Sequence, residues 1–413
     1  MSSIVSKPEL SDATPPTSPI GGVRNLASGP MLLFAITGVS LAAMAAAGAG
    51  AQDGYRQLGF SWVLNVWFVL SICLGAIFFV AIQHITRSSW SVTLRRPAEV
   101  IGASIVAPVI LLLPVVVALL MGSSAIFSWN NPELVAGDKI LLGKQAFLNA
   151  PFFAVRTAVY VAVWVIAGLW LLKTSLRQDE TGDKQLTLKM EGRSAPLLFA
   201  MAMTTTFGAF DWLMSLEPHW FSTIYGIYIF SGGMVGVLAV LSIIAAVWVR
   251  KGTHPKLVTK EHLHDIVKLL FGFNCFWAYI AFSQYLLIWY ANIPEETIWL
   301  KHRHEHGWNA VTMLLIFGHF IIPFIGLMPR AAKRNTTIVI AMSVWLLMMH
   351  WADMYWLVYP QFSQAPAFGF IEVFGLVFAV AATAFAARKF ASGQNAICLK
   401  DPRLEESVSH HVL

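Results

Sequence analysis

Acidic and histidine side chains stand inside or beside several long apolar stretches of this chain. An ionisable group in such a stretch is costly unless it has a partner or a task. Asp211 ends one apolar run, and Glu217 and His219 form the turn before the next one. His350 and Asp353 are three residues apart, which places them on one face of a helix. Because these groups titrate, the chemistry they could perform is proton transfer.

Two further groups extend this set. His319 precedes Pro323 by four residues, so the proline removes the hydrogen bond to the carbonyl of His319 and bends the helix. Glu372 lies near the start of the last apolar stretch, and a short loop makes that stretch an antiparallel neighbour of the one before it. We therefore expect His350, Asp353 and Glu372 to approach one another, with Asp211 at a similar depth.

A discontinuous polar route across the apolar region follows from these positions. Asp265 and Lys268, at i and i+3, are expected to pair at its inner end. Gln284 and His319 mark its middle, and the outer exit is expected at His350, Asp353, Asp211 and Glu372, followed by Glu217 and His219. A purely structural role is the alternative to a proton route. In that case His319 is a hydrogen-bonded interior residue and Asp211 cross-links helices.

The composition predicts an all-α, polytopic membrane protein. Of 413 residues, 57% are hydrophobic and 12% are charged, whereas soluble domains carry about 25% charged residues. The net charge of +6 resides in short loops, which argues against a nucleic-acid-binding face. The 3 Cys are far apart, so no iron–sulfur cluster or Cys-based zinc site is expected, and no helix pair offers an obvious haem site.

Ten stretches are long enough to cross a bilayer, which takes about 20 residues. We expect them at 31–51, 58–83, 99–121, 151–172, 194–214, 222–249, 265–291, 308–328, 337–358 and 366–388. Residues 1–29 are predicted to be a disordered tail, 30–390 the transmembrane domain and 391–413 a C-terminal tail. Most of the 28 Lys and Arg residues fall in the loops on the side of the termini, which predicts that both termini are cytoplasmic.

The connecting segments and the aromatic residues give further predictions. The segments 122–150 and 173–193 are predicted to be surface connections, and the charged run 301–306 a solvated loop rather than a metal site. Trp345, Trp351, Tyr355 and Trp356 are typical of an interfacial aromatic belt. A quinone site needs aromatic walls and a proton acceptor. The candidate residues for such a site are Trp212, Gln284, Tyr285, Trp289 and Tyr290.

Three stretches carry a resemblance to a known family: AFDWLMSLEPHWFSTIYGIYIFSGG (209–233), FGFNCFWAYIAFSQYLLIWYANIPEET (271–297) and HWADMYWLVYP (350–360). They resemble the ActF-type membrane subunits of alternative complex III, a bacterial quinol:electron-acceptor oxidoreductase. The likeness covers about residues 30 to 390. The wider relatives are NrfD/PsrC-type membrane subunits, which implies two four-helix bundles with flanking helices.

The resemblance implies a multi-pass subunit in the bacterial inner (cytoplasmic) membrane that serves respiratory or photosynthetic electron transport. Its implied partners are a homologous NrfD-like membrane subunit, an iron–sulfur subunit, haem c subunits and lipids. The redox centres would reside in those partners, while carboxylates and histidines of this chain would line half-channels for protons, with a bound quinone possible. A standalone secondary transporter and a purely structural membrane anchor remain alternatives.

Overall fold

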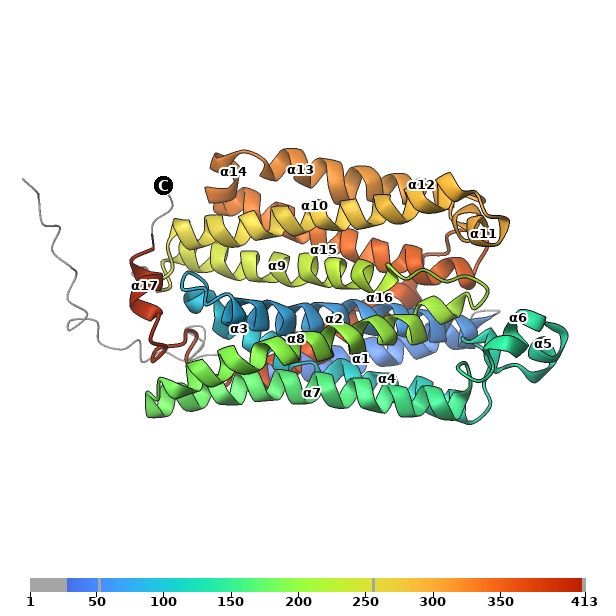
Figure 1. The fold of residues 1–413 in the computed structure, drawn as a ribbon, viewed down its shortest axis with the longest axis horizontal. Coiled ribbons are helices and arrows are strands. Elements are labelled where there is room, and N and C mark those ends of the chain that lie inside the picture. Colours follow the sequence, from blue (N-terminus) through green and yellow to red (C-terminus); the bar gives the residue numbers. More distant parts are fainter. Residues whose placement is uncertain (1–27, 51–52, 255–256, 411–413) are drawn as a thin grey trace, which may run out of the picture.

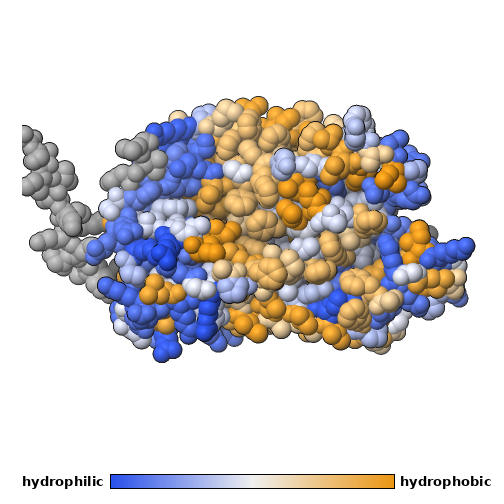
Figure 2. All heavy atoms as spheres, viewed as in Figure 1, coloured by the Kyte–Doolittle hydropathy of each residue, from blue (hydrophilic) through white to orange (hydrophobic). Residues whose placement is uncertain are grey.

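A computed structural model describes residues 28–50, 53–254 and 257–410. The regular elements of this part of the chain are helices, and ten of its helical segments are long and apolar enough to cross a membrane. The predicted all-α, multi-pass architecture is confirmed at this level. The long helices run side by side along the molecule (Figure 1). On the face shown in Figure 2 a broad apolar band covers their middle, and polar side chains gather at both ends.

The ten spans lie close to the stretches expected from the sequence. They are α1 (Ser28–Ala49), α2 (Gly54–Ile85), α3 (Val92–Ala103) continued by α4 (Val106–Leu120), α7 (Ala150–Thr181), α8 (Gln185–Trp212), α9 (Tyr225–Lys251), α10 (Lys260–Ala291), α12 (Trp308–Leu314) continued through a π-helix (Leu315–Ile321) into α13 (Ile322–Leu327), α15 (Thr336–Val358) and α16 (Phe370–Ala391). The short helices are α5 (Pro132–Gly137), α6 (Lys139–Lys144), α11 (Pro294–His302), α14 (Arg330–Arg334) and α17 (Leu404–Val408), with 3₁₀ turns at Ser128–Asn130, Met214–Leu216 and Tyr359–Gln361.

The two ends of the molecule are named here after the short helices beside them. The α17 end carries α14 and the last described residues, and the α11 end carries α5 and α6 (Figure 1). Helices α2, α8 and α10 cross the apolar band between these ends. The predicted disordered tail at 1–29 lies outside the described residues, apart from Ser28 and Gly29 at the start of α1.

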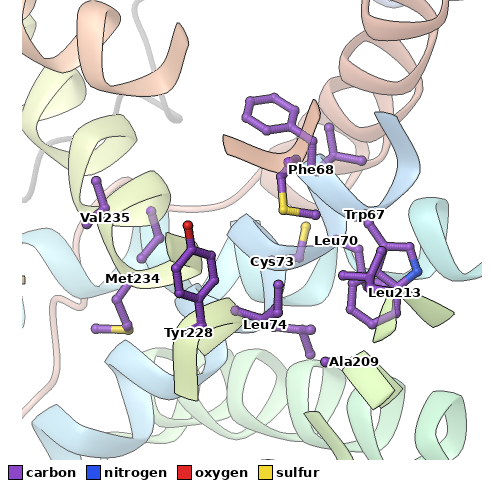
Figure 3. Close-up of a cluster of buried hydrophobic side chains, with 14 of the residues drawn as sticks. Trp67, Phe68, Leu70, Cys73, Leu74, Ala209, Leu213, Tyr228, Met234 and Val235 are labelled. Atoms are coloured by element: carbon purple, nitrogen blue, oxygen red, sulfur yellow. The ribbon is translucent and has the colours of Figure 1, made fainter. Parts of the chain in front are cut away.

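Helix α2 is the centre of the packing. In its most apolar window 94% of the residues are buried, and it contacts α3, α8, α9, α15 and α16. Figure 3 shows the resulting cluster, in which α2 contributes Trp67, Phe68, Leu70, Cys73 and Leu74, and α9 contributes Tyr228, Met234 and Val235. Ala209 of α8 and Leu213, the residue after this helix, complete the labelled set. Because α2 is buried on all sides, its few polar residues must find partners on neighbouring helices.

Two glycines allow the backbones of α2 and α9 to touch. A Cβ atom added at Gly75 would lie 2.4 Å from the carbonyl oxygen of Gly233, and one added at Gly233 would lie 2.5 Å from the carbonyl oxygen of Ser71. Small residues of this kind permit close helix packing inside membranes. The contact brings α9 and α15 against the polar face of α2.

The connections differ from the sequence-based expectation at two places. The segment 173–193 is not a surface connection, because α7 continues to Thr181 and α8 begins at Gln185. The predicted span 99–121 begins earlier, at Val92, because buried ion pairs accommodate its first charged residues. Arg95 binds Glu99 and Asp401, and Arg96 binds Glu99 and Asp179.

The described part of the predicted C-terminal tail is folded onto the α17 end. Ile397 and Cys398 are buried at 1% exposure, and Asp401 binds Arg95 at 2.5 Å. Ser407 accepts a hydrogen bond at its carbonyl from His262 of α10 at 2.9 Å. Residues 392–410 therefore cover the ends of α3 and α10 rather than extending from the molecule.

The contact between α2 and α9 predicts a stability difference between two glycines. Gly75→Ala places a methyl group against the backbone of α9, and such overpacking costs about 1–3 kcal/mol. Gly272→Ala in α10 is the matched control, because nothing lies within 4 Å of its added Cβ. Thermal unfolding of the detergent-solubilised protein should show a lower midpoint for Gly75→Ala alone. Equal midpoints for the two variants would contradict the close contact.

Candidate functional site

Asp353 lies in the interior between α9, α10 and α15 with 1% exposure. The hydroxyl of Tyr228 on α9 donates to its Oδ1, and the indole Nε1 of Trp277 on α10 donates to its Oδ2 at 3.0 Å. Both donors are neutral. Among the described residues the salt bridges include none to Asp353. The carboxyl group can therefore gain or lose a proton without breaking an ion pair.

Two buried histidines face the same region, and their hydrogen bonds define their tautomers. When Ser71 donates its hydroxyl hydrogen to the carbonyl of Phe68, at 2.8 Å, His350 Nε2 donates to the Ser71 Oγ, which lies 2.9 Å away. His319 Nδ1 lies 3.1 Å from the amide oxygen of Asn274 and donates to it. The other nitrogens, His350 Nδ1 and His319 Nε2, are buried acceptors that bind no described residue.

These three side chains converge. One ligand atom each from His319, His350 and Asp353 lies within 4.8 Å of the others. Two imidazole lone pairs and a carboxylate thus meet with no donor between them among the described residues. A proton can be shared between two of these acceptors at a time, and a water molecule could donate to the two histidine nitrogens. The same donor set has the types and number that zinc takes, so a divalent ion is chemically compatible with it.

Local features of three helices create this convergence. A Cβ atom at Gly232 would lie 2.9 Å from His350 Cε1, and one at Gly236 would lie 3.2 Å from His350 Cδ2, so these glycines make room for the ring. His319 belongs to the π-helix, whereas the sequence predicted a bend at Pro323, four residues later. Its ring stacks on Trp277 with 3.7 Å between ring centroids and 18° between planes.

Asp211 lies in a separate network, contrary to the expectation that it joins His350 and Asp353. Arg156 of α7 donates to both of its carboxylate oxygens at 2.8 Å, and Tyr160 donates at 2.9 Å. Asp211 is fully buried, and the guanidinium of Arg156 stacks on the ring of Phe147 at 3.8 Å. This bidentate ion pair links α7 to α8. This geometry matches the structural interpretation of the sequence, in which Asp211 cross-links two helices.

Glu372 heads a third network instead of joining His350 and Asp353. It accepts hydrogen bonds from Tyr359 and, at 2.9 Å, from Gln57 of α2. Asn65, two turns along α2, accepts a hydrogen bond from the indole of Trp351 at 2.8 Å. This network faces the α11 end, between α2, α15 and α16.

The prediction that the run 301–306 is solvated fails at one residue, Arg303, while the other five residues are exposed. Arg303, within the run expected to be a solvated loop, is 1% exposed and donates to the carbonyls of Trp356 and Leu357 at 3.2 and 3.0 Å. Its guanidinium also lies 3.5 Å from Glu217. His219, in the same region, lies 2.5 Å from Asp138.

The predicted aromatic belt is also incorrect. Tyr355 and Trp356 are 5% and 8% exposed, and the indoles of Trp345, Trp351 and Trp356 all donate to groups inside the protein. These side chains face the helix bundle because each has a polar partner there. They consequently form walls of the interior rather than anchors at a membrane surface.

The α17 end holds the predicted pair of Asp265 and Lys268, whose charged atoms are 2.6 Å apart. His410 of the C-terminal segment binds the other oxygen of Asp265, also at 2.6 Å. Between this pair and the histidines, Ser242 of α9 and Ser343 of α15 are fully buried, and their hydroxyls bind no described residue. Buried hydroxyls without protein partners are typical positions for bound water.

The five residues predicted to bind a quinone are not brought together. Gln284 and Tyr285 line a cavity of about 490 Å³ beside Tyr228 and Trp277. Trp212 is instead packed in the core against α7, where its indole donates to Thr157. Trp289 and Tyr290 are 62% and 82% exposed on the outside of α10. Only the first two residues can contact a ligand in this cavity.

The sequence was compared with protein-family models and with curated proteins. No family model matches the sequence, and no curated protein matches it significantly.

Several residues of these networks were not singled out from the sequence. Tyr228 and Ser71 are partners on other helices, and no spacing within one helix reveals such a contact. Arg156 is a third such residue, and its signal in the sequence is an arginine near the start of an apolar run, where it needs an anionic partner. Gly232 and Gly236 share one helix face, which is the signal of a close approach.

Different stabilities are expected when the two interior aspartates lose their charge. Asp211→Asn leaves Arg156 buried without its anion, and breaking a buried ion pair costs about 3–5 kcal/mol. Asp353→Asn keeps one acceptor oxygen for Trp277, and the Tyr228 hydroxyl can accept from the new amide group, so the change should cost less than about 1.5 kcal/mol. Thermal unfolding of both variants measures the difference. A larger loss for Asp353→Asn would show that its carboxylate is held by a charge.

A pH-dependent contribution to stability is expected from the loop pair Glu217 and His302, whose atoms lie 3.2 Å apart. The hydrogen bond to Glu217 raises the pKa of His302 above 6.5. Burial raises the pKa of Glu217, but the hydrogen bond from His302 and the charge of Arg303 outweigh it and hold that pKa below 4.5. The stabilisation is therefore lost above the raised pKa of His302 and below the lowered pKa of Glu217.

His302→Gln should lower the unfolding midpoint near pH 6 and have little effect near pH 9. The loss of stability near pH 6 should be well under about 1 kcal/mol, because the side chain of His302 is half exposed. His306→Gln in the same loop is the control and should have the same effect at both pH values. An equal effect of His302→Gln at both pH values would exclude a charged pair.

Proposed function

We propose that this chain is a proton-conducting membrane subunit of a bacterial quinol:electron-acceptor oxidoreductase of the alternative complex III type. The observation that carries the proposal is the convergence of His319, His350 and Asp353 on a point inside the apolar region. Three acceptors that share no protein donor can bind and release a proton, and an intramembrane set of this kind is a functional site by default. The family assignment rests on the sequence resemblance described above.

The helix pairings are consistent with the two four-helix bundles of that family. One set of contacts joins α2 to α3, α3 to α7, α7 to α8 and α8 back to α2. A second joins α9 to α10, α10 to α13, α13 to α15 and α15 back to α9. Contacts between α2 and α9 connect the two sets, and α1 packs on α16 beside them. The convergence site belongs to the second set, and the Asp211 ion pair to the first.

The route we propose starts at the α17 end, which the distribution of Lys and Arg assigns to the cytoplasm. Asp265 would receive protons there, and water at Ser242 and Ser343 would carry them toward His350. Ser343 precedes His350 by two helical turns, or about 10 Å, so this step of the proposed route requires a chain of several water molecules.

From the convergence site the route continues toward the α11 end. His350 donates to Ser71 of α2, and Asn65 lies about 9 Å farther along the same helix. Asn65 leads to Glu372, because its amide lies 3.3 Å from the Glu372 carbonyl and Gln57 binds the carboxylate itself. Glu217 and His219 belong to the loops at that end. We place Asp211 outside the route, as a cross-link of the first bundle.

Electron transfer is assigned to partner chains in this proposal. An iron–sulfur subunit and haem c subunits would hold the redox centres, and a homologous NrfD-like membrane subunit would pack beside this chain in the bacterial inner membrane. A standalone secondary transporter is the second candidate, since the π-helix interrupts a span near the site as broken helices do in transporters. Purification together with haem-containing subunits would favour the first candidate.

Replacement of Asp353 by Asn tests the proton role in the intact complex reconstituted in liposomes. Loss of a positioned acid–base group slows proton transfer by about 100-fold or more, so proton movement per electron should fall while the complex remains assembled. Asp183→Asn, in the exposed turn between α7 and α8, is the control with the same chemical change. Full quinol turnover with full proton movement in Asp353→Asn would contradict the proposed route.

A further inference from the structure

The two histidines of the convergence site are held from one side and free on the other. His319 Nδ1 lies 3.1 Å from the amide oxygen of Asn274, and His350 Nε2 lies 2.9 Å from the Ser71 Oγ. The remaining ring nitrogens, His319 Nε2 and His350 Nδ1, bind no described residue, and the two side chains are 0% and 1% exposed. Histidines that bind metal ions are held in this way, because a hydrogen bond from one nitrogen fixes the ring and leaves the other nitrogen as a ligand.

The spacing of His319, His350 and Asp353 fits a single small ion. Their ligand atoms all lie within 4.8 Å of one another, which leaves a point no farther than about 2.8 Å from each, compared with zinc bond lengths of about 2.0–2.2 Å. Each atom therefore has to move by less than about 1 Å to bind an ion there. Gly232 keeps this place open, because an added Cβ would lie 3.1 Å from His350 Nδ1 and 3.8 Å from Asp353 Oδ2.

The donor types select among divalent ions. Two imidazole nitrogens and one carboxylate are the protein ligands that Zn²⁺ takes in sites where water is the fourth ligand, whereas Mg²⁺ and Ca²⁺ prefer oxygen ligands. Asp353 supplies the negative charge, since its described partners are the neutral donors Tyr228 and Trp277. Each of its carboxylate oxygens accepts one hydrogen bond from them and keeps a lone pair for an ion.

We propose that the convergence site binds one Zn²⁺ ion, with His319, His350 and Asp353 as its ligands, and that the bound ion blocks the proton route. The binding follows from the geometry of the three side chains, and the block rests on the proposed function. A bound ion occupies the lone pairs that accept the proton, and it holds Asp353 in its ionised form. Zn²⁺ is thus an inhibitor of this subunit. Asn274 is a positioning residue, because its amide oxygen fixes the ring of His319.

Counting of bound zinc tests the site in the full-length chain, purified without a polyhistidine tag and with whatever subunits accompany it. The protein is loaded with ZnCl₂, freed of loose ions by gel filtration and analysed by inductively coupled plasma mass spectrometry. Asp353→Asn and His319→Gln should each hold one ion fewer per chain than wild type. Asp183→Asn, in an exposed turn, and His84→Gln, at a buried histidine outside this cluster, are the matched controls and should hold as many ions as wild type.

Asn274→Leu tests the positioning of His319 with all three ligands in place. Loss of an outer hydrogen-bond partner lowers metal affinity by about 10–100-fold. Zinc titration of this variant should reach the same number of ions as wild type, with one of them bound more weakly by that factor. Gln284→Leu removes another buried amide of α10 and is the control with unchanged affinity. Equal affinities for the two variants would show that Asn274 does not position the site.

Equal zinc contents of wild type, Asp353→Asn and His319→Gln, with all three assembled, would mean an adventitious ion only and would overturn the inference. In liposomes Zn²⁺ should slow proton movement by wild type, and Mg²⁺ at the same concentration should not. Proton movement that continues at the full rate with the ion bound would overturn the block.

The outcome for the metal site is separable from the outcome for the proton route. One zinc ion lost in Asp353→Asn, with full proton movement in the same variant, would keep the metal site and reject the route. Unchanged zinc content in Asp353→Asn, with loss of proton movement, would reject the metal site alone.

Discussion

The structure depends on how a carboxylate is accommodated in an apolar interior. Such a group needs either a cation or donors that supply its hydrogen bonds. Asp211 has the first solution, with both oxygens bound by Arg156, and Asp353 has the second, with a phenol and an indole. The first solution fixes the charge and links two helices. The second leaves the proton free to exchange, and the acceptor nitrogens of two histidines lie beside it.

Helix packing around α2 makes the second solution possible. The glycine contact between α2 and α9 places Ser71 where it can bind His350, and Gly232 and Gly236 leave room for the imidazole ring. The π-helix turns His319 toward the same point and stacks it on Trp277. Backbone irregularity and small residues thus position groups that regular helices with larger side chains would hold apart. The site is formed by residues of five helical spans and belongs to no single one.

The approximate positions of the spans, and the ionisable residues inside them, could be predicted from the sequence. Length and apolarity alone locate the helices, and Pro323 indicates the irregular helix around His319. Partnerships between helices were not predictable in the same way. Asp211 and Asp353 look alike in their segments, and only the position of Arg156 against α8 separates an ion pair from a titratable site. The burial of Arg303 likewise follows from backbone carbonyls at the end of α15, which no local pattern reveals.

In the proposed mechanism Asp353 exchanges a proton inside the protein, while Asp211 remains in its ion pair with Arg156. Infrared difference spectroscopy of the purified protein between two pH values detects the C=O stretching band of a protonated carboxylic acid directly. The account predicts such a band in wild type, its loss in Asp353→Asn and its persistence in Asp211→Asn. A band that survives in Asp353→Asn and disappears in Asp211→Asn would contradict the account.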